Sequence, residues 1–164
     1  MAVREILLLG NESLYQVSRE VTQDMDARQV INDLQDTMIN FRERHGFGRA
    51  IAAPQIGEFL RIIYMNFDNK SYALINPRLE LGEEEFEVWD DCMSFPGLEV
   101  KLNRYKKCKI FYKDLQWKDC FLEFEGDLSE LIQHEYDHLD GILAVQKAID
   151  NKSFRINPEK LGCF

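Results

Sequence analysis

Residues 133–141 read Gln-His-Glu-Tyr-Asp-His-Leu-Asp-Gly, an HExxH element that contains two of the three histidines in this 164-residue chain. On an α-helix, positions four apart lie on one face, so His134 and His138 can bind the same metal ion, with Glu135 close beside them. Metal ions held in this way activate water for hydrolysis. The element therefore predicts a helix that carries a metal site.

The residues around this element follow a helical pattern. Asp127 and Glu130 have the spacing of a capping box, and Gly141 is a typical place for a helix to end. The apolar residues between them recur at helical intervals: Leu128, Leu131, Ile132 and Leu139. We therefore expect a helix that starts near Asp127 and stops at Gly141. An apolar stripe is typical of core packing, so the metal hypothesis depends on the histidines.

A catalytic metal site commonly has three protein ligands and an open fourth position for water. In one metallopeptidase pattern the third ligand would be a histidine at the position of Ala144, and no histidine follows His138. A carboxylate of the C-terminal tail, such as Asp150 or Glu159, is one alternative. The thiolate of Cys92 is the favoured alternative, because this cysteine lies in a loop-like stretch that ends in Pro-Gly.

Three separated segments resemble the peptide deformylase family. The GxGxAAPQ loop, the EGCLS loop and the QHExDHLxG helix of that family correspond, in the same order, to residues 48–55, 90–94 and 133–141. The Ile-Asn-Pro segment at 75–77 also resembles a family position. This resemblance spans nearly the whole chain and implies one deformylase-like domain over residues 1–164.

The resemblance implies a metal-dependent hydrolase that removes the N-formyl group from the N-terminal formylmethionine of nascent polypeptides. It implies that Cys92, His134 and His138 bind one divalent metal ion. Fe2+ is the expected ion, and Zn2+, Ni2+ or Co2+ also suit thiolate and imidazole ligands. The resemblance implies that the substrate is an N-formylated peptide. It also implies a transient association with the ribosome.

The roles of the other site residues follow from the same resemblance. Glu135 would take a proton from the attacking water and deliver it to the departing amine. The side-chain amide of Gln55 and the backbone N–H of Met93 would stabilise the oxyanion. The substrate groove is expected to include four more residues: Gly48, Ala50, Ile51 and Arg104.

The chain departs from the family pattern close to the expected site. Ala50 replaces a glycine, and Arg49 lies where an apolar residue is common. Asp90 replaces a glutamate, and Asp91 replaces the glycine before Cys92, which adds bulk and negative charge. Two alternatives therefore stay open: a related N-formyl or N-acyl amide hydrolase with another substrate, and an inactive deformylase-like metal-binding protein.

Composition and charge predict the size of the core, the absence of direct DNA binding and the cellular location. A chain that is 45% hydrophobic can bury one substantial core, and a net charge of −9 argues against direct DNA binding. The apolar run within residues 1–10 is too short for a secretory signal, and no run is long enough to span a membrane. We expect a cytoplasmic protein with reduced cysteines.

The order of the predicted elements indicates an α+β fold. An amphipathic pattern predicts an N-terminal helix over residues 24–44, ended by Gly46. Four strand-like segments follow: 60–67, 72–75, 109–112 and 121–124. The first two flank a turn at 68–71, and the last two form a second pair. We expect a single domain in which mixed or antiparallel β-sheets pack around a central HExxH helix.

Overall fold

The computed structural model describes residues 2–162, in which two α-helices combine with two antiparallel sheets. The helices are α1 (Ala27–His45) and α2 (Asp127–Leu139). The strands are β1 (Ala50–Ala52), β2 (Ile62–Phe67), β3 (Lys70–Leu81), β4 (Glu85–Asp90), β5 (Leu98–Tyr105), β6 (Lys107–Lys113), β7 (Asp119–Glu125) and β8 (Phe154–Ile156). Four short 3-10 helices complete the order: η1 (Glu12–Tyr15), η2 (Ala53–Ile56), η3 (Ala144–Lys147) and η4 (Pro158–Lys160).

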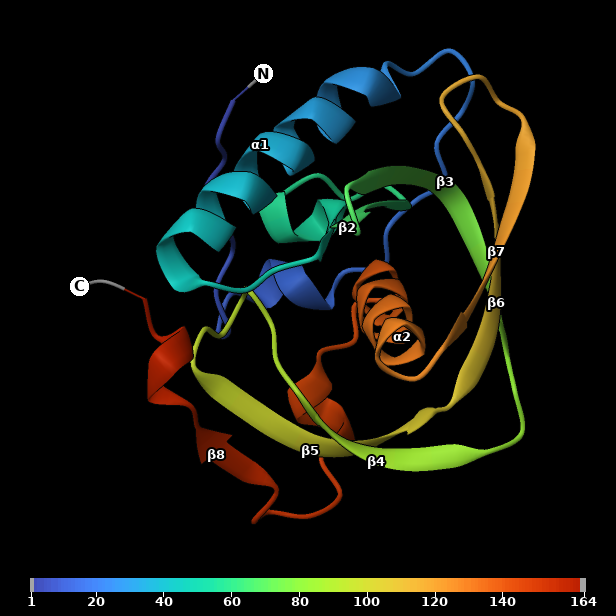
Figure 1. Cartoon of the computed structure of the whole chain (residues 1–164). Helices are drawn as coiled ribbons and strands as arrows, with labels where there is room; N and C mark the ends of the chain where they lie inside the picture. The colour runs from blue at the N-terminus through green and yellow to red at the C-terminus, as the bar shows by residue number, and fades with distance from the viewer. Residues whose placement is uncertain (1, 163–164) are drawn as a thin grey trace.

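The two sheets surround α2. One sheet has the strand order β1-β2-β3-β6-β7, and the other has the order β4-β5-β8. Figure 1 shows α2 in the middle of the molecule, with both sheets around it and α1 on the outside. Ile132 and Leu139 of α2 are fully buried against residues of the larger sheet, such as Ile63 and Ile110. The expected α+β fold with a central HExxH helix is confirmed.

Helix α1 follows its predicted pattern closely. It begins at Ala27, three residues after the predicted start, and its apolar residues Leu34 and Met38 are fully buried. It ends where Gly46 adopts a left-handed φ of 78°. The Gly46 N–H then donates a hydrogen bond of 2.9 Å to the carbonyl of Arg42. Glycine adopts this conformation without steric cost, which explains the sharp end of the helix.

The two expected hairpins are confirmed. Strands β2 and β3 pair in register from Ile62↔Ile75 to Phe67↔Lys70. The two turn residues between them, Asp68 and Asn69, both have positive φ, as a tight two-residue hairpin turn requires. Strands β6 and β7 pair along their whole length.

The Ile-Asn-Pro segment has a clear structural role. Asn76 lies at an irregularity of β3, where its backbone has a φ of +48°. Its amide donates to the carbonyl of Val21 at 2.8 Å and accepts from the Val21 N–H at 2.8 Å. This pair of bonds fixes the segment that leads into α1 against the larger sheet.

Two further expectations can be compared with the structure. Cys92, Cys108 and Cys120 are free thiols, and Cys163 lies outside the described residues. Among residues 2–162, neither helix combines the length and the apolar character that crossing a bilayer requires.

Leu34→Ala should lower the free energy of unfolding by about 2–5 kcal/mol, because it removes a fully buried side chain from the contact between α1 and the sheet. Ile39→Ala is the matched control on the same helix: its side chain is 39% exposed, so the loss should stay below about 1 kcal/mol. Urea unfolding of both variants measures the difference. Equal losses would contradict this assignment of the core.

Candidate metal centre and active site

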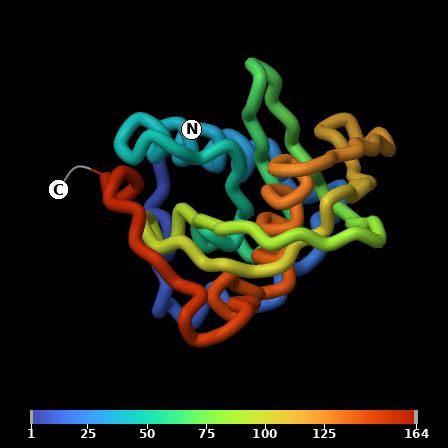
Figure 2. Tube along the Cα trace, turned by 60° about the horizontal axis from the view of Figure 1, so that its bottom comes forward, coloured from blue at the N-terminus to red at the C-terminus, as the bar shows by residue number. Residues whose placement is uncertain are grey.

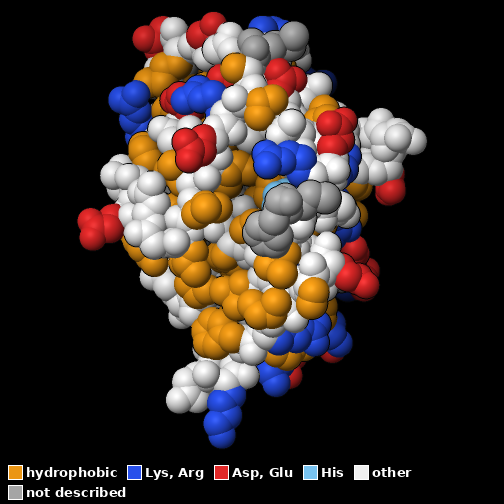
Figure 3. Space-filling view, turned by 90° about the vertical axis from the view of Figure 1, so that its left-hand side faces the viewer, with side chains coloured by type: hydrophobic (Ala, Val, Ile, Leu, Met, Phe, Trp, Pro, Cys, Tyr) orange, Lys and Arg blue, Asp and Glu red, His pale blue; other side chains and the backbone are white. Residues whose placement is uncertain are grey.

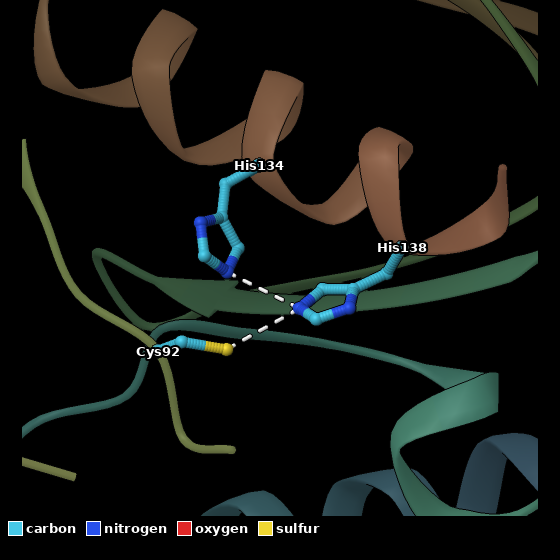
Figure 4. Close-up of side chains that lie close together, drawn as sticks. All are labelled: Cys92, His134 and His138. Atoms are coloured by element: carbon cyan, nitrogen blue, oxygen red, sulfur yellow. Dashed lines mark hydrogen bonds between the residues drawn. The ribbon is translucent and has the colours of Figure 1, made fainter. Parts of the chain in front are cut away.

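Three side chains from two parts of the chain converge on one point. His134 and His138 project from α2, and Cys92 projects from the loop between β4 and β5, as Figure 4 shows. The Nε2 atom of His138 lies 3.3 Å from Cys92 Sγ and 3.2 Å from His134 Nε2. All three residues are buried, and their potential ligand atoms lie within 4.8 Å of one another.

This geometry fits a tetrahedrally coordinated metal ion. Sulfur and nitrogen ligands at about 2.3 and 2.0 Å from a shared ion lie about 3.3–3.6 Å from each other. The two separations from His138 Nε2, 3.3 and 3.2 Å, are close to these values. Three ligands leave a fourth position open, which is typical of catalytic rather than structural sites. The thiolate and imidazole donors suit Fe2+, Zn2+, Co2+ and Ni2+.

Asp90, the last residue of β4, orients the first histidine. Its Oδ1 atom lies 2.8 Å from His134 Nδ1, which leaves Nε2 directed toward Cys92 and His138. Burial opposes the ionisation of Asp90, but His134 and Arg104 outweigh it and lower the pKa of this carboxyl to about 2. A carboxylate that holds the outer nitrogen of a ligating histidine fixes both its tautomer and its ring orientation.

The Asp90 carboxylate is itself held by Arg104. The Arg104 side chain is only 2% exposed and donates to Asp90 Oδ2 at 2.7 Å and to Asp137 Oδ2 at 2.5 Å. Burial alone would lower the pKa of Arg104, but the charges of Asp90 and Asp137 outweigh it and raise the pKa. This chain of ion pairs joins β4, β5 and α2 directly behind the metal-ligand cluster.

Glu135 lies between the two histidines in sequence and borders the same site. Its side chain is 4% exposed, and its Oε2 atom has no hydrogen-bond partner among the described residues. Burial raises the pKa of Glu135 to about 7. An unpaired buried carboxyl beside a candidate metal site, with a pKa near neutrality, is suited to accept and release a proton.

Gln55 reaches the site from η2. Its Oε1 atom accepts a hydrogen bond of 2.9 Å from the Ala52 N–H, which fixes the orientation of the amide. Its Nε2 atom then points toward the site, 3.5 Å from Cys92 Sγ and 3.2 Å from Ser94 Oγ. The amide is therefore a preoriented hydrogen-bond donor beside the cysteine.

A cavity of about 220 Å3 opens next to these groups. One wall is formed by residues 47–50 and the other by residues 91–93, and Leu131, Glu135 and Lys160 complete the lining. Gly48 has a φ of +118°, and a Cβ atom there would lie 2.7 Å from Met93 Cε. The positive φ is what favours glycine at this position, because the flexible Met93 side chain could move away from a Cβ atom.

Comparison with known proteins decides the family. The family model described as polypeptide deformylase matches residues 3–154. Peptide deformylase 1 of Prochlorococcus marinus is 37% identical, covering 97% of this chain and 88% of its own, and the peptide deformylase of Dictyoglomus turgidum is 32% identical, covering 92% and 96%. The chain belongs to the peptide deformylase family. The crystal structure of peptide deformylase from Thermotoga maritima superposes with a TM-score of 0.82 at 30% identity, over 92% of this chain and 100% of that one.

Most residues expected from the deformylase resemblance lie together. The predicted ligands Cys92, His134 and His138 converge, and Gln55 and Glu135 border the same site. Met93, Gly48 and Ala50 line the cavity. Ala50 has an ordinary strand backbone, so its extra methyl group is accommodated without strain.

Arg104 is buried behind the candidate ligands and is not among the described residues that line the cavity. The side chain of Ile51 is fully buried in the core. The assignment of these two residues to substrate binding stays a prediction. One interpretation from the sequence is wrong. Asp127 does not cap α2, because Gly126 is the N-cap; its carboxylate instead pairs with Arg49 at 2.8 Å.

Two residues that hold the deformylase site in place were not expected from the sequence. Gln133, next to His134, exchanges hydrogen bonds with the backbone of Tyr105 at 2.8 and 3.0 Å, which fastens α2 to β5. Arg42 of α1 donates to the Gly48 carbonyl at 2.7 Å and so supports one cavity wall. The only signal for Gln133 was its place inside the HExxH segment.

Arg104→Met should lower the free energy of unfolding by about 3–5 kcal/mol, because it leaves Asp90 and Asp137 without their buried cation. The same change should reduce metal occupancy, since Asp90 orients His134. Arg78→Met is the control: it removes an exposed pair with Glu80 and should cost no more than about 1 kcal/mol. Urea unfolding and metal analysis measure both effects, and a normal metal content in a destabilised Arg104→Met protein would refute the orienting role.

Proposed function

We propose that this protein is a metal-dependent deformylase that hydrolyses the formamide bond of N-terminal formylmethionine in nascent polypeptides. Its membership of the peptide deformylase family supports this activity. The observation that carries it is the convergence of Cys92, His134 and His138 beside the buried carboxyl of Glu135 and the oriented amide of Gln55. A site built only for structure would need neither of the last two groups.

We infer that Cys92, His134 and His138 hold one divalent cation, and we propose Fe2+, with Zn2+, Ni2+ or Co2+ as substitutes. When bound, the cation supplies Lewis acidity that makes a water nucleophile available at neutral pH. Asp90 keeps His134 in the ligating orientation, with its Nε2 atom turned toward the other candidate ligands. Neutral imidazole is the form that binds metal.

Glu135 carries the proton in this proposal. Its carboxylate accepts a proton from the attacking water as the water oxygen bonds to the formyl carbon. It then delivers that proton to the methionine nitrogen as the carbon–nitrogen bond breaks, so formate and a free amine leave the site. A pKa raised to about 7 by burial suits both steps, because proton transfer is most effective when the pKa lies near the working pH.

Gln55 and Met93 stabilise the negative oxygen that forms during the attack. The Gln55 amide is already oriented by its bond to Ala52 and needs no rearrangement before it donates. Met93 follows Cys92 directly and lines the same cavity, so its backbone N–H is the second proposed donor.

A second candidate function uses the same machinery on another N-formyl or N-acyl amide. It is favoured by the charged residues Arg49, Asp91 and Lys160, which line the cavity beside apolar ones such as Phe47 and Leu131. An inactive metal-binding protein is the third alternative, and the intact Glu135 and Gln55 argue against it.

The setting of the reaction is also a proposal. We infer one domain over the whole chain, in line with the family match across residues 3–154. A cytoplasmic location and a transient association with the ribosome agree with a substrate that is a nascent polypeptide. The net charge of −9 argues against direct DNA binding.

Purified protein loaded with iron under anaerobic conditions, or with nickel, should release formate from formyl-Met-Ala-Ser in proportion to its metal content. Acetyl-Met-Ala-Ser and formyl-Ala-Ala-Ser should be poorer substrates, since the proposal is specific for formylmethionine. Glu135→Ala is the matched variant: it should keep the metal but lose about 10²- to 10⁴-fold in kcat, the usual contribution of a general base. Equal use of the analogues would favour the second candidate, and normal turnover by metal-loaded Glu135→Ala would refute the mechanism.

Gln55→Ala should lower kcat by about 10²- to 10³-fold while leaving KM nearly unchanged, because the lost hydrogen bond forms mainly in the transition state. Since Gln55 Nε2 also lies 3.5 Å from Cys92 Sγ, metal content must be measured on the same sample. A rise in KM with unchanged kcat would assign Gln55 to substrate binding instead.

A further inference from the structure

The segment that follows the family match lies against the proposed active site. The match ends at residue 154, whereas the described chain continues through β8 and η4 to residue 162. Figure 2 shows this segment running beside the start of β5 toward the end of α1. On the face shown in Figure 3, acidic and basic side chains lie next to one another in the upper half, and hydrophobic side chains predominate in the lower half.

Specific contacts fix the position of this C-terminal segment. Strand β8 pairs with β5 through Leu98↔Ile156, and the Asn157 N–H donates to the Gly97 carbonyl at 2.7 Å. Gly97 has a φ of +86°, and a Cβ atom there would lie 2.3 Å from Leu161 Cδ2. The C-terminal segment therefore packs against Gly97, where the absence of a Cβ atom leaves room for Leu161. These contacts hold the segment beside the site.

The position of this segment makes Lys160 part of the lining of the cavity, which Cys92, Met93 and Glu135 also line. Its Nζ atom lies 2.5 Å from Asp91 Oδ2 and 3.5 Å from Glu99 Oε2. It also lies 5.5 Å from the centre of the Phe47 ring, which belongs to the opposite wall. Lys160 thus contacts both walls of the cavity.

Asp91 is the residue whose charge needs this partner. It lies directly before Cys92, its backbone does not have a positive φ, and its side chain is 33% exposed at the cavity. Partial burial alone would lower the pKa of Lys160, but Asp91 and Glu99 outweigh it and raise the pKa, so the lysine stays charged. Without Lys160, the Asp91 carboxylate would present an unpaired negative charge to any substrate.

The cavity volume of about 220 Å3 shows which part of a peptide would meet this pair. It is smaller than the roughly 300 Å3 at which pockets for larger ligands begin, so it can enclose little more than the first residue. The following residue would then pass the rim, where Asp91 and Lys160 are partly exposed to solvent.

We propose that Lys160 determines the charge preference of the substrate cleft: by neutralising Asp91, it allows formylated peptides with either a basic or an acidic second residue to bind. This inference rests on the proposed deformylase function and specifies its substrate range. Lys160 lies beyond residue 154, where the match to the family model ends, and it reaches Asp91 from the C-terminal segment.

The test compares formyl-Met-Lys-Ser with formyl-Met-Glu-Ser. In the unmodified protein the two values of kcat/KM should agree within about threefold, because the charges at the rim are paired. In Lys160→Met the ratio of the basic to the acidic peptide should rise about tenfold, mainly through KM, since one unpaired carboxylate attracts one peptide and repels the other. The preference should shrink at about 1 M salt, where charges are screened within about 3 Å.

Two variants control for other effects of the substitution. Lys107→Met removes the same charge from β6, where Lys107 pairs only weakly with Glu125 at 3.8 Å, and should leave the ratio unchanged. Adding Asp91→Asn to Lys160→Met should return the ratio to its original value. Metal content is measured on each variant, because Asp91 adjoins the candidate ligand Cys92.

Binding measurements separate this inference from the proposed activity. Calorimetry with acetyl-Met-Lys-Ser and acetyl-Met-Glu-Ser reports the same preference without hydrolysis, and the affinity ratio should shift in Lys160→Met as the kinetic ratio does. If no formylated peptide is hydrolysed but the affinity ratio shifts, the deformylase function fails and the role of Lys160 stands. If formyl-Met-Ala-Ser is hydrolysed and neither ratio changes in Lys160→Met, or Lys107→Met shifts them equally, the role of Lys160 is overturned.

Discussion

The buried ion pairs of Arg104 with Asp90 and Asp137 are the constraint on which the site depends. They join β4, β5 and α2 at one point, and Asp90 uses its second oxygen to hold His134 at 2.8 Å. A buried charge network gains little net stability over an apolar contact, yet breaking one partner is costly. In this protein the network serves to position residues. The contacts that fix α2 between the sheets also fix the orientation of the His134 ring, a candidate metal ligand.

The sequence predicted the parts of the fold that are governed by local patterns. Helix α1 and the two hairpins carry clear periodicity, and their ends are marked by Gly46 and by Asp68 and Asn69. Strands β4 and β5 were not predicted, although they supply Asp90 and Arg104. In both strands apolar and polar residues alternate, as in Glu85-Phe86-Glu87-Val88 of β4 and Leu98-Glu99-Val100-Lys101-Leu102 of β5. This alternation is itself a strand signal, so these two strands could have been predicted from the sequence.

The candidate site could be predicted only where chemistry and spacing coincide. His134 and His138 are four positions apart on one helix, so their convergence follows from helix geometry. Cys92 is more than 40 residues away, and its place in the site followed from the family resemblance, not from spacing. The assignment of Arg104 to the groove also came from the family resemblance, and no pattern in the sequence indicated its ion pairs with Asp90 and Asp137. These two partners lie on β4 and α2, and only the fold brings them together.

Charged side chains line the cavity together with apolar ones, and the arrangement of those charges explains how the fold tolerates them. Arg49 pairs with Asp127, and Asp91 pairs with Lys160, so each charge next to the site has an opposite charge from another element. An aspartate beside a thiolate ligand would otherwise add negative charge to a cluster that already holds Asp90 and Glu135. The C-terminal segment removes that repulsion without filling the cavity, because it is seated on Gly97 and reaches the rim with a long, flexible side chain. Asp91 and the tail are thus physically linked, because the charge beside the candidate ligand Cys92 is paired with a lysine 69 residues later in the chain.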